Sequence, residues 1–310
     1  MVDKPAHHGR MEMGRRLFAC LLAGGMLATP RTGWGAEEDT VTDCRGRHVK
    51  IGPARRIASI GGTITETLYA LGAQDRIIAV DITSTWPEQA LREKKSVGYM
   101  RALSAEGILS LRPDLMLAMN DCGPPPVLDQ LMASTVPVVF VDATPSEDAI
   151  VARTRFIASL LDARTAGTRL CADISQHFDM LTQWRAAHPT TKRVLFVMRM
   201  SNNRPMVAGT GTAADAVIRL AGGSNPAAFE GYKILDQEAL IGLQPDAVLT
   251  MEQDAPQVRA ARRGNAGGRL TPAGRKPAIS ARAGERLLGF GPRTPDAALE
   301  LARRLGGTPA

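Results

Sequence analysis

Apolar residues occur along this chain in a pattern that appears once in each half. In the first half, an apolar run at 56–60 leads through a Gly-Gly-Thr loop into a segment with helical spacing at 65–70. In the second half, an apolar run at 193–197 leads through a polar loop into a segment with helical spacing at 213–220. A short apolar run bounded by turn residues predicts a buried strand, and apolar residues three and four positions apart predict a helix. Each half therefore begins with a predicted strand and helix.

A second motif repeats further along each half. Gly98-Tyr99 and Gly231-Tyr232 each lead into a short segment with a capped-helix pattern, followed by a Leu-x-Pro-Asp turn and an apolar run. These patterns predict a short helix, a turn and a buried strand. Because strand, loop, helix, turn and strand recur in the same order, the sequence predicts a duplication into two α/β lobes, each with a parallel sheet covered by helices on both faces.

The segment between the two copies has a different pattern. Residues 146–188 contain no proline and only one glycine, and their apolar positions have helical spacing. We predict one long connecting helix here, and a break near 163–167 is the alternative. The predicted parts are then an N-terminal lobe at 37–145, the connecting helix at 146–188 and a C-terminal lobe at 189–310. Open parallel sheets bind ligands at the carboxyl ends of their strands, so the cleft between two such lobes is the predicted binding site.

Residues 1–36 have the pattern of a secretory signal peptide. Two arginines precede an apolar run at 17–28, and small residues follow before residue 37. The run is too short for a transmembrane anchor, which needs about 20 apolar residues. Lipidation at Cys20 is not predicted, because most of the apolar run follows that cysteine. We expect an exported protein without stable membrane insertion, and the export route stays open.

Charge and composition exclude some classes of partner and of protein. The formal net charge of +7 falls to +4 without residues 1–36, which hold five basic and two acidic side chains. A mildly basic chain suits an anionic ligand, whereas nucleic acid binding needs a concentrated basic stripe with stacking aromatic residues, which this sequence lacks. The cysteines that remain are Cys44, Cys122 and Cys171, an odd number without close spacing, so no disulfide framework is expected.

No motif of a known catalytic class stands out. The chain lacks a His-Glu-x-x-His segment, a phosphate-binding Gly-Lys-Ser/Thr loop and a Gly-x-Ser-x-Gly elbow. His48, His177 and His188 fall outside the predicted cleft loops, which argues against a zinc or manganese carrier. We therefore predict a protein that is not an enzyme, with an exported α/β enzyme as the alternative from another class.

Two of the three tyrosines occupy equivalent loop positions. Tyr69 falls inside a predicted helix, whereas Tyr99 and Tyr232 follow the repeated glycine. A phenolate ligates ferric haem iron, and a cation at Arg101 would stabilise a phenolate or pair with a haem propionate. Flexible apolar side chains suit the flat face of a macrocycle, and further cations suit two propionates. The methionines concerned are Met100, Met198, Met200 and Met206, and the cations are Arg199, Arg204 and Lys233.

The sequence from Gly98 to Gly107, Gly-Tyr-Met-Arg-Ala-Leu-Ser-Ala-Glu-Gly, closely resembles a motif of the periplasmic haem-binding proteins of bacterial haem ABC importers. The resemblance continues at 123–131, 208–223, 231–233 and 288–294. It implies two Rossmann-like α/β lobes with parallel sheets joined by a long rigid α-helix, in a monomeric periplasmic protein whose transported ligand is haem. It also implies that Tyr99 ligates the iron and that Arg101 supports it. The wider similarity includes cobalamin-binding and siderophore-binding proteins, so a cobalamin or ferric-siderophore carrier is the alternative.

The resemblance also implies a membrane partner. In such proteins one glutamate on each lobe pairs with arginines of the permease dimer of the ABC transporter, and the matching positions are Glu106 and Glu238. Each begins a short predicted helix at an equivalent place in the duplication. Two acids placed in this way suit a partner with two-fold symmetry.

One segment departs from the family pattern. Residues 254–286 contain seven arginines, several glycines and hardly any consecutive apolar residues. The family has a helix and a hydrophobic strand there, and 277–285 is a poor candidate for a central strand because buried charges need partners. Either the C-terminal lobe is locally loose or the reading frame is disturbed over this stretch.

Overall fold

The computed structural model describes residues 39–202, 204–251, 255–256, 258, 279–281 and 288–306. The predicted signal peptide at 1–36 and most of the atypical segment at 254–286 lie outside these residues. None of the described helices combines the length and the apolar character that crossing a membrane requires.

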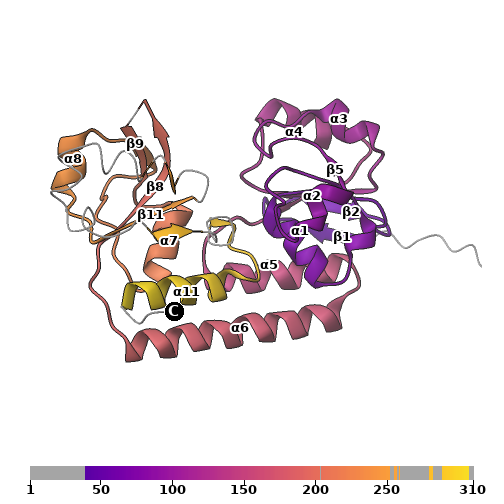
Figure 1. Ribbon diagram of the computed structural model, residues 1–310. Helices are drawn as coiled ribbons and strands as arrows, with labels where there is room; N and C mark the ends of the chain where they lie inside the picture. The colour runs from indigo at the N-terminus through magenta and orange to yellow at the C-terminus, as the bar shows by residue number, and fades with distance from the viewer. Residues whose placement is uncertain are drawn as a thin grey trace, which may run out of the picture. The chain divides into compact units, whose positions relative to one another are not determined.

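The N-terminal lobe contains a five-stranded sheet in the order β5-β4-β3-β6-β7, and every neighbouring pair is parallel. In three of these five strands, β3, β6 and β7, every residue is buried. Burial on both faces explains why their apolar runs are continuous and do not alternate with polar residues. The strands are β3 (Ile57–Ile60), β4 (Ile77–Val80), β5 (Lys95–Ser96), β6 (Leu115–Met119) and β7 (Val138–Val141). The helices are α1 (Gly62–Ala70), α2 (Gln89–Glu93), α3 (Ala105–Ser110) and α4 (Pro125–Met132), with a 3-10 turn η1 (Gln74–Arg76). A separate hairpin of β1 (Asp39–Thr42) and β2 (His48–Ile51) precedes this sheet (Figure 1).

The sheet of the C-terminal lobe corrects one prediction. Its order is β10-β9-β8-β11-β12, and all of its strands run in one direction except β9. The strands are β8 (Val194–Ser201), β9 (Arg204–Ala208), β10 (Tyr232–Ile234), β11 (Ala247–Met251) and β12 (Ile279–Ala281). The fully parallel sheet was wrong for β9, which pairs antiparallel with both β8 and β10. The physical reason is that only two residues separate β8 from β9, and so short a connection joins antiparallel strands, whereas parallel strands need a long crossover. Residues predicted as a polar loop are therefore part of a hairpin.

The short strand β12 lies at the edge of this sheet, beside β11. It comes from the atypical segment, and an edge position places fewer demands on burial than a central one. The remaining helices of the lobe are α7 (Ala213–Leu220), α8 (Gln237–Gly242) and α11 (Thr294–Gly306).

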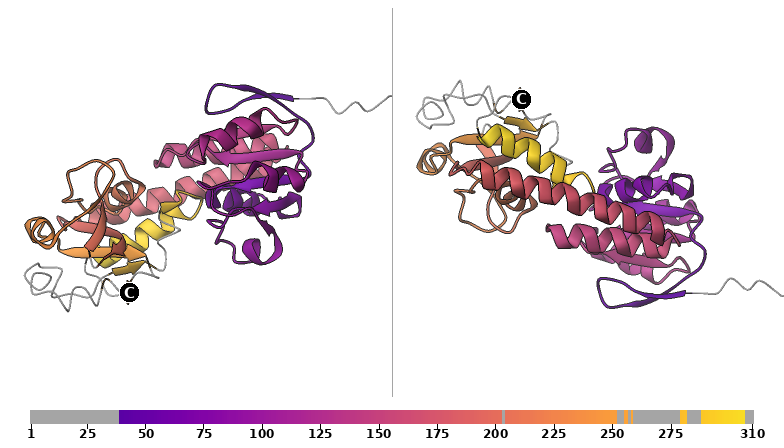
Figure 2. Two further views of the ribbon diagram at one scale, coloured as in Figure 1. Left: turned by 90° about the horizontal axis from the view of Figure 1, so that it is seen from above. Right: turned by 90° about the horizontal axis from the view of Figure 1, so that it is seen from below.

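Two helices occupy the stretch at 146–188, so the unbroken helix was wrong and the alternative with a break is confirmed, the break lying at 161–163. They are α5 (Glu147–Leu160) and α6 (Arg164–Ala187), and between them Asp162 has a φ of 56°, in the left-handed region that ends helices. The two helices lie side by side (Figures 1 and 2). A Cβ atom at Gly167 would lie 2.3 Å from the Ala158 Cβ, so the close approach requires a glycine.

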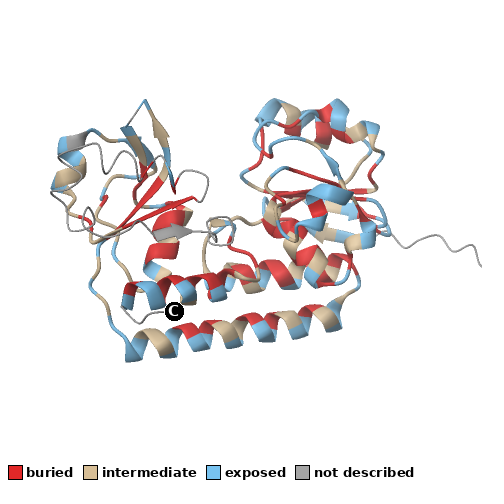
Figure 3. Ribbon diagram, in the orientation of Figure 1, coloured by how far each residue is buried: buried red, intermediate tan, exposed pale blue. Residues whose placement is uncertain are grey.

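The connection between the lobes is α6. Ile174, Phe178 and Leu181 belong to the apolar core of the C-terminal lobe, while Ala166 and Leu170 pack against the core of the N-terminal lobe. Buried and exposed positions alternate along its length (Figure 3). One helix with a buried stripe thus contributes to both cores.

The segment 288–293, which we call the C-terminal clasp, runs back from the C-terminal lobe to α1. The Arg293 backbone N–H and its Nη2 each donate a hydrogen bond to the Glu66 carboxylate, both at 2.9 Å. The Thr63 hydroxyl donates to the Gly289 carbonyl, and the Arg293 guanidinium lies 4.1 Å from the centre of the Trp86 ring. The side chains of Glu66 and Arg293 are 11% and 22% exposed, so the pair is mostly shielded from water.

We expect Glu66→Gln to lower the free energy of unfolding by about 1–3 kcal/mol, because it leaves the mostly buried Arg293 charge without its partner. The matched control is Glu300→Gln, whose carboxylate pairs with Arg304 while 50% exposed, and there a loss below about 0.5 kcal/mol is expected. Urea denaturation of both variants measures the difference. Equal losses in the two variants would show that the clasp has no special role in stability.

Candidate functional site

The loop that carries Tyr99 is fixed to two strands of the N-terminal lobe at their carboxyl ends. The Gly98 carbonyl accepts a hydrogen bond from the Ile82 N–H at 2.9 Å, just after β4. The Met100 carbonyl accepts one from the Gly123 N–H at 2.9 Å, after β6. Gly98 has a φ of 83°, a conformation that favours glycine. The loop thereby buries Met100 in the apolar core and leaves Tyr99 41% exposed.

Arg101 forms an ion pair with a carboxylate that the sequence analysis did not identify. Its Nη2 lies 2.6 Å from the Asp121 Oδ2. The hydrogen bond to Asp121 raises the pKa of Arg101, and the interaction with the phenol of Tyr99 adds to that rise. Asp121 follows the buried strand β6 closely, and this position at the carboxyl end of a predicted strand was the signal that could have revealed it.

The second tyrosine lies near the same arginine. Burial raises the pKa of the Tyr232 phenol, while the positive charge of Arg101 and a hydrogen bond with Thr212 offset part of that rise. Arg101 thus acts on Tyr99 of one lobe and on Tyr232 of the other. The duplication predicted equivalent tyrosines, and Arg101 interacts electrostatically with both.

The strands β8, β9 and β10 divide the other predicted residues between two faces of the sheet. Tyr232 and Ile234 are two positions apart on β10 and share a face, whereas Lys233 points to the opposite face. Met206 is the register partner of both Ile234 and Arg199, so these three side chains form a row across the strands.

Arg204 lies two positions before Met206 on β9 and therefore shares its face of the sheet. Met198 on β8 is partly buried and packs against the core on the same face. Met200 packs against the core on the other side of the sheet. Lys233 lies on that side too, with its Nζ 5.1 Å from the centre of the Phe229 ring. The structure therefore groups Met198, Arg199 and Arg204 with Tyr232, and it separates Met200 and Lys233 from them.

Exposed apolar side chains also occur beside the Tyr99 loop and on β10. Large apolar residues that are exposed in the described part of the chain are Ile82, Trp86, Leu91, Tyr99, Met180, Tyr232 and Ile234. Ile82 contacts the Tyr99 loop, and Ile234 shares a face with Tyr232. Sequence reasoning missed both isoleucines, because a single exposed isoleucine has no pattern. Exposed apolar groups beside a cation suit a flat, largely apolar, anionic ligand.

We expect the pKa of Tyr232 to rise further in Arg101→Met, because the arginine charge lowers it in the wild type. Since burial raises the folded-state pKa, the stability that the neutral phenol contributes is complete below the ordinary tyrosine pKa and is lost as the pH rises through the folded value. An ultraviolet titration in a Tyr69→Phe, Tyr99→Phe background reports Tyr232 alone. Arg199→Met is the control and should leave the titration unchanged; a lower midpoint in Arg101→Met would contradict the assignment.

The two acidic residues predicted to face a partner are both exposed. Glu106 lies in the first turn of α3, which Ser104 caps, and Glu238 lies in the first turn of α8, which Asp236 caps. Neither glutamate forms an ion pair with another residue of the described ranges. The two halves thus present one free carboxylate each, at equivalent positions of the duplication.

In the part of the chain that the structure describes, no group of three or more His, Cys, Asp and Glu side chains could hold a bare metal ion. The candidate site consists of phenols, guanidinium groups and apolar side chains, which suit the binding of a ligand. The comparison with known families agrees with this reading: a family described as periplasmic binding protein matches residues 57–276. The chain belongs to this family of periplasmic binding proteins.

Solved structures and a curated relative extend this result. The periplasmic haem-binding protein BhuT, solved in complex with two haems, is 40% identical, with a TM-score of 0.76 over 81% of this chain and 97% of that one. The periplasmic haem-binding protein RhuT from Roseiflexus sp. RS-1 is 35% identical, with a TM-score of 0.75 over 80% of this chain and 97% of that one. The vitamin B12-binding protein of Pectobacterium atrosepticum is 27% identical over 63% of this chain and 71% of its own length. The two-lobed fold and the resemblance drawn from the sequence are confirmed.

Proposed function

We propose that this periplasmic binding protein captures ferric haem, with the Tyr99 phenolate as an axial ligand of the iron. The observation that supports this most is the exposed Tyr99 beside Arg101, on a loop fixed to the carboxyl ends of β4 and β6. A tyrosine oxygen is a known ligand type of haem iron, and an exposed position makes that oxygen accessible to a ligand. The similarity to haem-binding proteins at 40% and 35% identity supports the same cargo.

The remaining residues fit the other parts of the ligand. Arg199 and Arg204 are exposed cations on the face of Tyr232 and would pair with propionates. Ile82, Ile234 and Met198 would contact the flat ring, and Met100 supports the Tyr99 loop from the core. Met200 and Lys233 lie on the opposite face of the sheet and have no place in this proposal.

A cobalamin carrier is the second candidate, and the vitamin B12-binding relative supports it. In that case Tyr99 would only line the site. Haem is favoured because the haem-binding structures are more similar in sequence than this relative and because a phenol next to a guanidinium supplies an iron ligand.

The two exposed glutamates support a proposal for how haem is delivered to a membrane transporter. We propose that Glu106 and Glu238 dock on arginines of the permease dimer of an ABC transporter, and that the protein acts as a monomer that carries haem without transforming it. Residues 1–36 would direct export to the periplasm, and the lobes would extend over 37–145 and 189–310.

Equilibrium dialysis of the purified protein against haemin, cyanocobalamin and a ferric siderophore tests the choice of cargo. We expect saturable binding of haemin alone. Saturable binding of cyanocobalamin with no retention of haemin would replace the first candidate by the second.

A further inference from the structure

The turn between β1 and β2 is organised by a buried carboxylate. Asp43 is 4% exposed and accepts hydrogen bonds from the backbone N–H groups of Arg45 at 2.9 Å and Arg47 at 3.0 Å. The Arg47 Nη2 adds an ion pair at 2.8 Å. Burial by itself would raise the pKa of Asp43, but the hydrogen bonds from Arg47 outweigh it and lower that pKa, so the carboxylate stays ionised. The turn is therefore a fixed structure.

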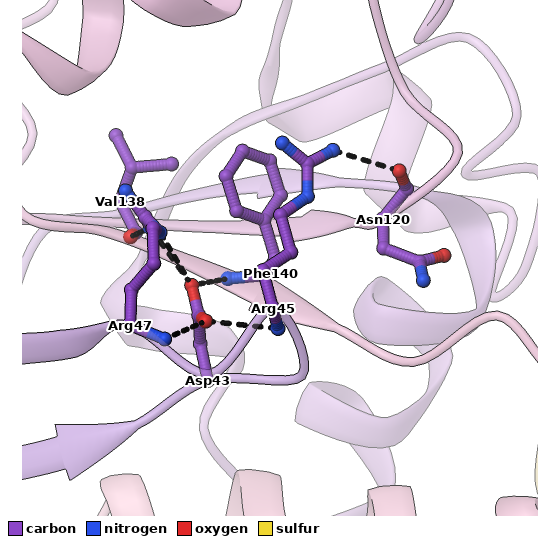
Figure 4. A network of polar contacts seen from close by, with 6 residues as sticks. All are labelled: Asp43, Arg45, Arg47, Asn120, Val138 and Phe140. Atoms are coloured by element: carbon purple, nitrogen blue, oxygen red, sulfur yellow. Dashed lines mark hydrogen bonds and ion pairs between the residues drawn. The ribbon is translucent and has the colours of Figure 1, made fainter.

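This turn directs Arg45 toward the haem-binding loops. The Arg45 guanidinium lies 3.5 Å from the centre of the fully buried Phe140 ring, and its Nη2 donates a hydrogen bond of 2.8 Å to the Asn120 carbonyl. Figure 4 shows Arg45 reaching from the turn, across the ring, to Asn120. The next residue in the chain is Asp121, which holds Arg101.

The ion pair between Arg101 and Asp121 needs such support. Its side chains are 58% and 42% exposed, and an exposed ion pair contributes little free energy and does not fix a geometry by itself. Arg101 can be held beside Tyr99 only if the backbone that carries Asp121 is itself held. Stacking on an aromatic ring and a charged donor to a backbone carbonyl provide that hold.

We propose that Arg45 is a positioning residue of the site: through the Asn120 carbonyl it fixes Asp121, and through Asp121 it places Arg101 beside the ligand tyrosine. The inference rests on the proposed function, and it adds a part of the chain that lies before the family match at 57–276. The N-terminal hairpin is then part of the binding machinery.

The test compares Arg45→Gln with Arg47→Gln and Arg45→Lys. Arg47 is the matched control, because Arg47→Gln removes a guanidinium that lies over the same Phe140 ring at 4.9 Å but keeps the backbone hydrogen bonds to Asp43 that shape the turn. The Arg47 side chain donates to the Val138 carbonyl and not to Asn120. Arg45→Lys keeps a charged donor for Asn120 but loses the planar group that stacks on Phe140.

Two readouts are needed. In the ligand-free protein, amide hydrogen exchange at Leu103 and Gly123 reports how firmly the loop of Asp121 is attached to the loop of Tyr99, since these N–H groups donate the hydrogen bonds that join the two loops. In the haemin complex, the iron–phenolate charge-transfer band and the rate of haem transfer to apomyoglobin report the ligand geometry. We expect Arg45→Gln to speed exchange and haem loss about fivefold and to shift the band, with partial rescue in Arg45→Lys.

Arg47→Gln should lower stability while leaving the exchange at Leu103 and Gly123, the band and the transfer rate as in the wild type. Wild-type behaviour of Arg45→Gln, or equal changes in Arg45→Gln and Arg47→Gln, would overturn the inference. If the wild type does not bind haemin, the proposed function fails, and the exchange rates alone still decide whether Arg45 holds the Asp121 loop.

Discussion

Tyr99→Phe is expected to weaken haemin binding by about a hundredfold, which corresponds to about 3 kcal/mol. The variant keeps the aromatic ring in its exposed position but removes the oxygen that would bind the iron. Arg101 keeps its ion pair with Asp121 in this variant, so the expected loss comes from the missing ligand oxygen. Competition with apomyoglobin measures the affinity.

Tyr69→Phe is the matched control for this result. The Tyr69 hydroxyl lies in α1, buried and without a hydrogen-bond partner, so its removal is expected to leave haemin affinity within about twofold of the wild type. An unchanged affinity in Tyr99→Phe would contradict the assignment of this residue as the iron ligand.

Haem uptake by cells is expected to depend on Glu106 and Glu238. The double variant Glu106→Lys, Glu238→Lys should abolish haem uptake and leave haemin affinity unchanged. The reason is that removing or reversing one charge of an ion pair buried in an interface costs about 2–5 kcal/mol for each pair. Growth on haem as the sole iron source, in cells that depend on this protein, measures uptake. Either single reversal should give a partial defect.

The control for delivery reverses two other exposed acids, Glu93 on α2 and Glu300 on α11, and uptake should persist. Equal loss of uptake in the control would mean that net charge, and not the two equivalent positions, governs docking. Loss of haemin binding in the Glu106, Glu238 variant would place these acids in the ligand site instead.

The repeated motifs predicted much of the fold. Continuous apolar runs at 57–60 and 115–119 correspond to strands buried on both faces. The capped short helix predicted in each copy is α3 or α8, and the structure shows Ser104 and Asp236 as their caps. The antiparallel hairpin was missed because β8 continues through Arg199 and Ser201, where alternation of apolar and polar residues is hard to distinguish from a polar loop.

The site was predictable only in part, for a physical reason. Tyr99, Arg101 and Tyr232 stood out because they occur in repeated or specific motifs. Asp121 contacts Arg101, and Ile82 contacts Gly98, so both lie against the loop of Tyr99 from segments that are distant in sequence. Such contacts depend on how the strands are ordered in the sheet. The face that each residue of β8 to β10 occupies was likewise set by strand register, which no local pattern reveals.

Resonance Raman spectra of the haemin complexes of the wild type, Tyr99→Phe and Tyr232→Phe decide which side chain ligates the iron, because an iron–phenolate vibration identifies the ligand atom itself. We expect this vibration in the wild type and in Tyr232→Phe, and its loss in Tyr99→Phe. A vibration that persists in Tyr99→Phe, or one that disappears only in Tyr232→Phe, would contradict the assignment of Tyr99.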